Sequence, residues 1–129
     1  MTVFGEQKGG GNTIFHMQVD GINLCHLGDL GHILSKDKLV EIGLVDILFI
    51  PIGGFYTIDY QQATQIMQDI QPKITIPMHY KTEVIKFPID TLEPFIQDKD
   101  KVKQLKDKEL EIFRENLPLE NQIIILPWE

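Results

Sequence analysis

The stretch His26-Leu27-Gly28-Asp29-Leu30-Gly31-His32 follows directly on an apolar run, residues 22–27, that is typical of a β-strand. It places two histidines and an aspartate at spacings of three, with a glycine before and after the aspartate. Glycine allows a tight turn at the end of the strand, and carboxylate and imidazole groups are ligands of zinc, manganese and iron. The stretch therefore predicts a strand that delivers a candidate metal ligand, Asp29, to its carboxyl end.

A β-hairpin is predicted immediately upstream of this stretch. Residues 13–19 alternate, with apolar side chains at positions 15, 17 and 19 on one face, which is a strand pattern. Asp20-Gly21 is a typical two-residue hairpin turn, after which the chain returns as residues 22–27. We expect residues 1–11 to be irregular, because the glycines at positions 9, 10 and 11 are too flexible for the interior of an element.

Downstream, helices and strands are predicted to alternate. Ser35 can cap a helix over Lys36–Ile42, and Asp59 with Gln62 can form a capping box for a helix over Tyr60–Ile70. The other predicted elements are strands over residues 46–50, 73–77, 109–113 and 122–126 and a helix over residues 91–98. This order indicates an α+β fold, a mixed sheet with helices on one face.

The size and composition of the chain limit the classes of protein to which it can belong. The chain has 129 residues, which predicts a single domain over residues 1–129. Its net charge of −7 argues against binding to nucleic acid or to an anionic membrane. The lysines between positions 99 and 108 are interleaved with aspartates, so we expect a solvated segment there.

The location of the protein is predicted from its cysteine content and its apolar runs. Cys25 is the only cysteine, which excludes an intrachain disulfide and fits a reducing compartment; by default it is a small buried apolar residue. The first residues lack a secretory apolar region, and the longest apolar run, residues 47–52, is far shorter than the ~20 residues of a membrane helix. We therefore expect a cytoplasmic protein.

Asp29 and His79 are the candidate metal ligands, because each follows an apolar strand and precedes a loop. In layered α/β proteins, functional sites gather at such strand ends. Each residue also has a structural interpretation, Asp29 as a turn residue and His79 as a hydrogen-bonded histidine at a strand end. Two ligands are fewer than the three or four that zinc requires, and His26 and His32 could complete the set.

Three histidines and a pair of glycines lie at or near the predicted site. We expect His26 to pack or to hydrogen bond behind the ligands, His32 to line a loop, and His16 to be solvated on the hairpin. Gly53-Gly54 either lets the backbone approach a substrate or turns the chain after a strand. The spacing required for a nucleotide-binding glycine loop or for a serine nucleophile elbow is not present in the sequence.

Four segments in this order resemble the metallo-β-lactamase superfamily. They are residues 11–15 (GNTIF), 26–32 (HLGDLGH), 51–59 (PIGGFYTID) and 76–80 (IPMHY). The resemblance covers nearly the whole chain and is to the branch of predicted Zn-dependent hydrolases that includes ascorbate-6-phosphate lactonase-like proteins. It implies a four-layer αββα sandwich, in which Asp29 bridges two metal ions (zinc, or manganese or iron) and His79 binds the second.

The chain departs from that family in its histidines, and residues 2–5 (TVFG) lack the histidine that usually lies shortly upstream of the glycine-rich segment. It has no His-x-His-x-Asp-His cluster, which supplies the first ligands in the family. The resemblance therefore implies the C-terminal half of the domain, with one apolar face of its sheet left for a partner. Exposing such a face would be costly, so we expect a homodimer or a pairing with a separate N-terminal half.

Three functional interpretations follow from the resemblance. The chain is part of a metal-dependent hydrolase that cleaves an ester, lactone or phosphoester of a small molecule, completed by the other half. Alternatively, it is a catalytically degenerate oligomeric structural or binding module of the same fold. In the third interpretation, His26, Asp29, His32 and His79 form a reduced metal site. Fold alone does not name the substrate.

Overall fold

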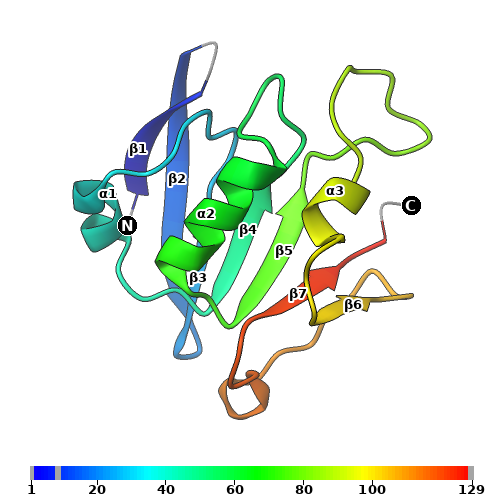
Figure 1. The fold of residues 1–129 in the computed structure, drawn as a ribbon. Coiled ribbons are helices and arrows are strands. Elements are labelled where there is room, and N and C mark those ends of the chain that lie inside the picture. Colours follow the sequence, from blue (N-terminus) through cyan, green and yellow to red (C-terminus); the bar gives the residue numbers. More distant parts are fainter. Residues whose placement is uncertain (1, 8–9, 128–129) are drawn as a thin grey trace.

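A mixed β-sheet forms the centre of the computed structural model, which describes residues 2–7 and 10–127 (Figure 1). Among the described residues the sheet has seven strands in the order β1-β2-β3-β4-β5-β7-β6. The strands are β1 (Thr2–Gln7), β2 (Gly10–Val19), β3 (Ile22–His26), β4 (Ile47–Pro51), β5 (Ile74–Met78), β6 (Val102–Gln104) and β7 (Gln122–Ile125). The pairs β1–β2 and β2–β3 are antiparallel, and the remaining neighbours are parallel. The predicted mixed sheet is confirmed.

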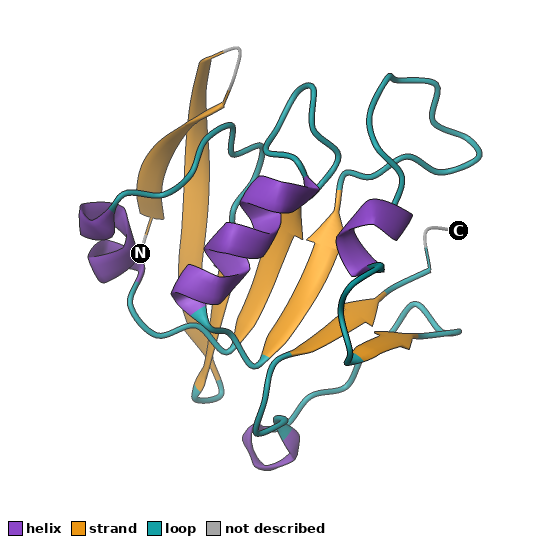
Figure 2. Ribbon diagram, viewed as in Figure 1, coloured by secondary structure: helices purple, strands orange, loops and turns teal. Residues whose placement is uncertain are grey.

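The helices lie on one face of the sheet (Figure 2). They are α1 (Lys36–Ile42), α2 (Tyr60–Ile70), the short α3 (Glu93–Ile96) and the 3-10 helix η1 (Arg114–Asn116), of which α1, α2 and α3 pack on this face. The predicted caps are present: Ser35 accepts a hydrogen bond from the Lys38 amide, and Asp59 and Gln62 form a capping box. Their apolar side chains cover a core that includes Ile14, Cys25, Leu48, Ile50, Ile66 and Phe95. Local capping signals thus define both longer helices.

Residues near the N-terminus form strands, which corrects one prediction. We expected residues 1–11 to be irregular, but Thr2–Gln7 pairs with the start of β2, and Gly10 lies opposite Gln7. Hydrogen bonding along an antiparallel ladder offsets the conformational freedom of the glycines. Met1, Lys8 and Gly9 lie outside the described residues.

The closing strands also differ from the prediction. β7 is present, but its edge partner is β6 at Val102–Gln104, parallel to it, rather than residues 109–113. Residues 109–113 are extended without a ladder, and Leu110 and Ile112 pack on the sheet's second face. Their alternating pattern therefore reflects a segment lying on a sheet, which periodicity alone does not distinguish from a strand within one.

The second face of the sheet, opposite the helices, is covered only in part. Residues 105–117 pack on a cluster formed by Ile22, Ile47, Ile74, Ile76 and Ile124. On β2, by contrast, Phe15, Met17 and Val19 remain 47%, 49% and 48% exposed. The prediction that this whole face would be open is thus wrong over the centre of the sheet. An apolar stripe does remain at β2.

Two further features of the described residues bear on the predictions. Cys25 is fully buried, and burial raises the pKa of its thiol to about 12, so it behaves as an apolar core residue. Within residues 2–7 and 10–127, no helix combines the length and the hydropathy needed to cross a bilayer.

Candidate metal centre

Three parallel strands bring the candidate residues to one edge of the sheet. β3, β4 and β5 are neighbours and run in the same direction, so their carboxyl ends lie together. His26 ends β3 and Asp29 follows it, the Gly53-Gly54 turn follows β4, and His79 follows β5. This is the edge at which open α/β sheets hold their ligands.

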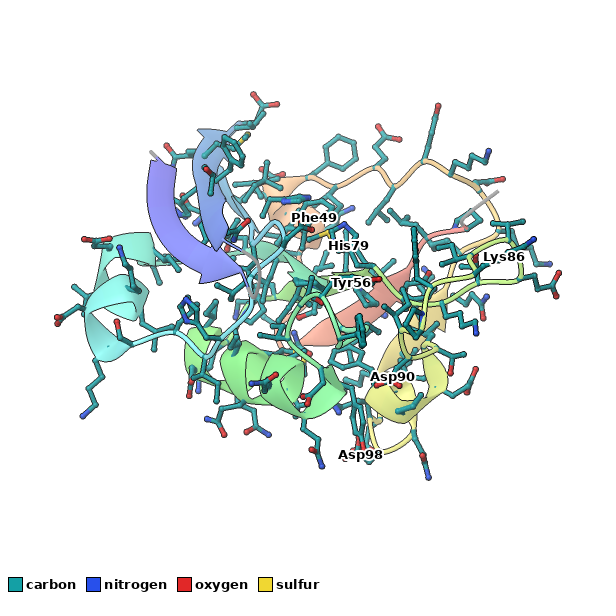
Figure 3. The ribbon with its side chains drawn as sticks, turned by 90° about the horizontal axis from the view of Figure 1, so that it is seen from above. Phe49, Tyr56, His79, Lys86, Asp90 and Asp98 are labelled. Atoms are coloured by element: carbon teal, nitrogen blue, oxygen red, sulfur yellow. The ribbon has the colours of Figure 1, made fainter. Side chains whose placement is uncertain are left out.

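Asp29 and His79 meet at this edge. The Nδ1 atom of His79 lies 3.2 Å from the Oδ1 atom of Asp29, and the two side chains are 44% and 56% exposed. His79 also lines one pocket with Tyr56, and Figure 3 shows these two side chains from above. Tertiary structure thus pairs two residues that lie 50 positions apart in the sequence.

Asn12 holds the turn that carries Asp29. Its Oδ1 atom accepts a hydrogen bond from the Asp29 amide at 2.9 Å, and its Nδ2 group donates to the Leu27 carbonyl at 2.8 Å. Gly28 between them has φ +61°, and a Cβ there would lie 2.6 Å from the same Oδ1 atom. The sequence contained Asn12 within a family-like segment, but its role becomes visible only when β2 lies beside the turn.

His79 takes a left-handed backbone conformation, with φ 55°, directly after β5. Such a conformation is uncommon for a residue with a Cβ atom. Its carbonyl oxygen lies so close to Gly53 that a Cβ on Gly53 would be 2.2 Å from it. Gly53 therefore acts structurally, by letting the His79 backbone approach β4. Gly54, with φ +71°, makes the turn itself.

His26 lies beside the pair without joining it. The Gly28 amide donates to its Nδ1 atom at 3.1 Å, and its ring stacks on Phe49 with centroids 5.5 Å apart. Partial burial lowers the pKa of His26, His79 lowers it further, and Asp29 opposes both by raising it. His26 thus makes packing and hydrogen-bonding contacts beside Asp29 and His79.

The other two histidines lie outside the Asp29–His79 pair. A ring nitrogen of His32, Nδ1, is 2.9 Å from the Ile33 carbonyl in the loop after Asp29. The Nε2 atom of His16 is 3.1 Å from the Leu44 carbonyl, so this ring is half-buried against the chain rather than fully solvated as expected. Among the described residues, no four-residue metal site is therefore assembled from Asp29, His79, His26 and His32.

A pocket of about 450 Å³ opens beside Asp29 and His79. Such a volume lies within the range of small-molecule sites, roughly 300–1,000 Å³. Its remaining lining residues are Gly54, Tyr56, Thr57, Ile85, Phe87 and Ile89. They come from the turn after β4 and from the loop after His79, so the sequence motifs found only part of the pocket.

The donor set fits a transition-metal ion in part. A carboxylate oxygen and an imidazole nitrogen at this separation, both accessible from the pocket, are suitable ligands for zinc, manganese or iron. No group of three or more such side chains is assembled among residues 2–7 and 10–127. Asp29 and His79 thus offer two donor groups, fewer than the three or four that a bound zinc ion requires.

Known proteins with similar sequences carry metal-dependent functions in their names. A family model described as "Beta-lactamase superfamily domain" matches residues 2–79. A UPF0173 metal-dependent hydrolase of Carboxydothermus hydrogenoformans is 44% identical over 68 residues, which is 53% of this chain and 30% of the relative. One of Archaeoglobus fulgidus is 32% identical over 98 residues, 76% of this chain and 39% of the relative. The chain thus spans about a third of the length of these relatives.

Solved structures show the same architecture. A Thermotoga maritima protein described as a Zn-dependent hydrolase of the metallo-β-lactamase superfamily superposes with a TM-score of 0.85 and 34% identity. The match covers 96% of this chain and 63% of that one. A metallo hydrolase from Ignicoccus hospitalis matches with a TM-score of 0.58 and 28% identity, over 74% of this chain and 43% of its own.

Proposed function

Because this chain belongs to the family of β-lactamase superfamily domains, we propose that it carries one side of a metal-dependent hydrolase site. The motif resemblance and the fold predicted from it are confirmed by the family match and by the superposition. The observation that carries the proposal is the 3.2 Å approach of Asp29 and His79 beside a pocket. The names of the relatives support a hydrolase.

In this proposal, Asp29 and His79 are two ligands of zinc, manganese or iron, and the other half of the domain supplies the rest. The bound metal would activate water and polarise an ester, lactone or phosphoester. Asn12 orients the Asp29 turn through two hydrogen bonds. Because Gly53 has no side chain, the His79 backbone can lie against the end of β4. His26 packs on Phe49 beside the two ligands.

Replacing either ligand should weaken metal binding by this chain. In Zn²⁺ and Mn²⁺ titrations followed by calorimetry, we expect Asp29→Asn and His79→Asn each to weaken binding by more than about tenfold, because even outer-shell changes cost that much. Asparagine is chosen at position 79 because it tolerates the left-handed backbone found there. Thermal melts establish that both variants fold.

Asp37→Asn is the matched control, since it removes an exposed carboxylate from the first turn of α1. It should leave metal affinity unchanged. Binding that survives in both ligand variants, or that is lost equally in the control, would contradict the proposed site. The hydrolase function would then give way to the second interpretation, a structural or binding module.

We further propose that the apolar stripe on β2 is a docking surface and that two copies of the 129-residue chain pair through it. Phe15, Met17 and Val19 lie on the face without helices, each about half exposed. Beside them, a groove of about 340 Å³ is lined by Val19, Asp20, Ile22, Leu24, Ile47, Phe49, Ile76, Leu110, Ile112 and Leu126. Contiguous apolar surface of this kind favours association.

Light scattering coupled to size-exclusion chromatography tests the pairing. We expect the unmodified chain to elute as a dimer and the double variant F15S/M17S to elute as a folded monomer, with an unchanged circular-dichroism spectrum and a melting temperature that no longer depends on concentration. The proposal would be contradicted if the unmodified chain stays monomeric at all protein concentrations that can be measured. If a separately supplied N-terminal half replaces the second copy in the dimer, the apolar stripe on β2 is the binding surface for that half instead.

A further inference from the structure

The pocket beside Asp29 and His79 has apolar walls. Tyr56 and Phe87 face each other edge-on with ring centroids 5.9 Å apart, and Phe55 extends the group with a centroid 4.6 Å from Tyr56. Ile85 and Ile89 complete the wall on the side of the loop after His79. The aromatic rings of Phe55, Tyr56 and Phe87 are 61%, 50% and 60% exposed, so they present surface for a ligand.

Among the described residues, no lysine or arginine lines this pocket, and His79 is its only basic side chain. Lys86 belongs to the same loop, but it lies well away from His79 and Tyr56 (Figure 3). A separate cavity of about 720 Å³ is lined in part by Lys81, Lys106 and Lys108. A phosphate or carboxylate on the part of the substrate that lies against the apolar walls, away from Asp29 and His79, would therefore find no lysine or arginine to pair with, in a chain whose net charge is −7.

From this lining we infer that the pocket binds an uncharged aromatic or branched apolar group of the substrate. The inference rests on the proposed function and narrows its substrate class. It favours a neutral ester or lactone with an apolar group beside the reacting bond over a phosphorylated substrate. In this arrangement Tyr56 and Phe87 hold the apolar group, while Asp29 and His79 stand at the polar end of the same pocket.

Ligand binding tests the inference without requiring activity. The 129-residue chain, labelled with ¹⁵N and kept in EDTA, is titrated with acetanilide as the neutral aryl probe and with phenyl phosphate as the anionic one. We expect saturable amide shifts at Tyr56, Thr57, Phe87 and Ile89 with acetanilide. Phenyl phosphate should bind at least about fivefold more weakly, because no cation compensates its desolvation.

Variants separate the aromatic wall from the rest of the surface. Phe87→Ala should weaken acetanilide binding about fivefold, as expected for the loss of one aromatic contact. Phe113→Ala is the matched control, because Phe113 is also about half exposed (53%) but does not line the pocket, and it should leave binding unchanged. Thermal melts should be the same for both variants.

Three results would overturn the inference: no saturable shifts at the pocket residues, tighter binding of phenyl phosphate, or an equal effect of Phe113→Ala. Because this titration is made in EDTA, aryl binding does not depend on a metal ion, and Asp37→Asn, at a position outside the pocket, should leave acetanilide affinity unchanged. Failure of metal binding together with intact aryl binding would therefore refute the proposed function alone. Intact metal binding together with failed aryl binding would refute the inference but not the proposed function.

Discussion

Gly53→Ala should lower the free energy of unfolding by about 3 kcal/mol, the upper part of the usual range for overpacking. The added Cβ would lie 2.2 Å from the His79 carbonyl oxygen and 3.2 Å from the Ile89 Cβ atom. Neither neighbour can retreat easily, because the Asp90 amide donates to the Gly53 carbonyl at 2.7 Å. Urea denaturation measures the loss, and the His79 amide shift reports its displacement.

Gly43→Ala separates this clash from the general cost of replacing a glycine. Gly43 has φ +70°, and the nearest atom to a Cβ there is the Val40 carbonyl oxygen at 4.0 Å. Its replacement meets open space and should cost only the strain of a backbone at φ +70° and ψ −146°, a region that glycine occupies almost alone, about 2 kcal/mol, without displacing the His79 amide. Equal losses for the two variants would show that the close approach of Gly53 to His79 is unimportant.

Phe95→Ala should cost about 3–5 kcal/mol, as expected for truncating a fully buried phenylalanine. Phe95 is the buried residue of the four-residue helix α3, which follows the loop bearing the pocket wall. Lys99 ties this helix to α2, since its Nζ atom donates to the Phe95 carbonyl at 2.9 Å and to Thr64 Oγ1 at 3.1 Å. Such a loss is a large part of a typical stability of about 5–15 kcal/mol.

Chemical denaturation and the pocket titration together check this prediction. Phe113→Ala, at an exposed position, should change stability by less than about 0.5 kcal/mol. Phe95→Ala should also weaken acetanilide binding if α3 supports the loop containing Phe87. A loss of stability near that of Phe113→Ala would show that α3 contributes little to the core.

Local chemistry made much of the fold predictable. The Asp20-Gly21 turn, the Ser35 cap and the Asp59–Gln62 capping box are interactions within a few residues, so the sequence contains all their partners. The edges of the sheet were harder to predict. Residues 2–7 and 102–104 are strands because each pairs with a neighbouring strand. Residues 109–113 do not form a strand, because they pack on the second face of the sheet instead of pairing at its edge.

The candidate site divides in the same way. Asp29 and His79 were identified from their positions after predicted strands and from the family resemblance. Asn12, Tyr56 and Phe87 were not assigned roles, because each acts through contacts with residues distant in the sequence. Gly53 was expected either to meet a substrate or to turn the chain; the structure instead places it against the His79 backbone.

The sequence by itself determined the family, the two longer helices, the hairpin turn and the two candidate ligands, because periodicity, capping and strand-end motifs are local properties. Only the tertiary structure decided that Asp29 and His79 lie 3.2 Å apart and share an apolar pocket. It alone also decided which apolar strand face stays exposed at β2. The physical reason is that distances across a sheet depend on strand order and register, which long-range packing sets.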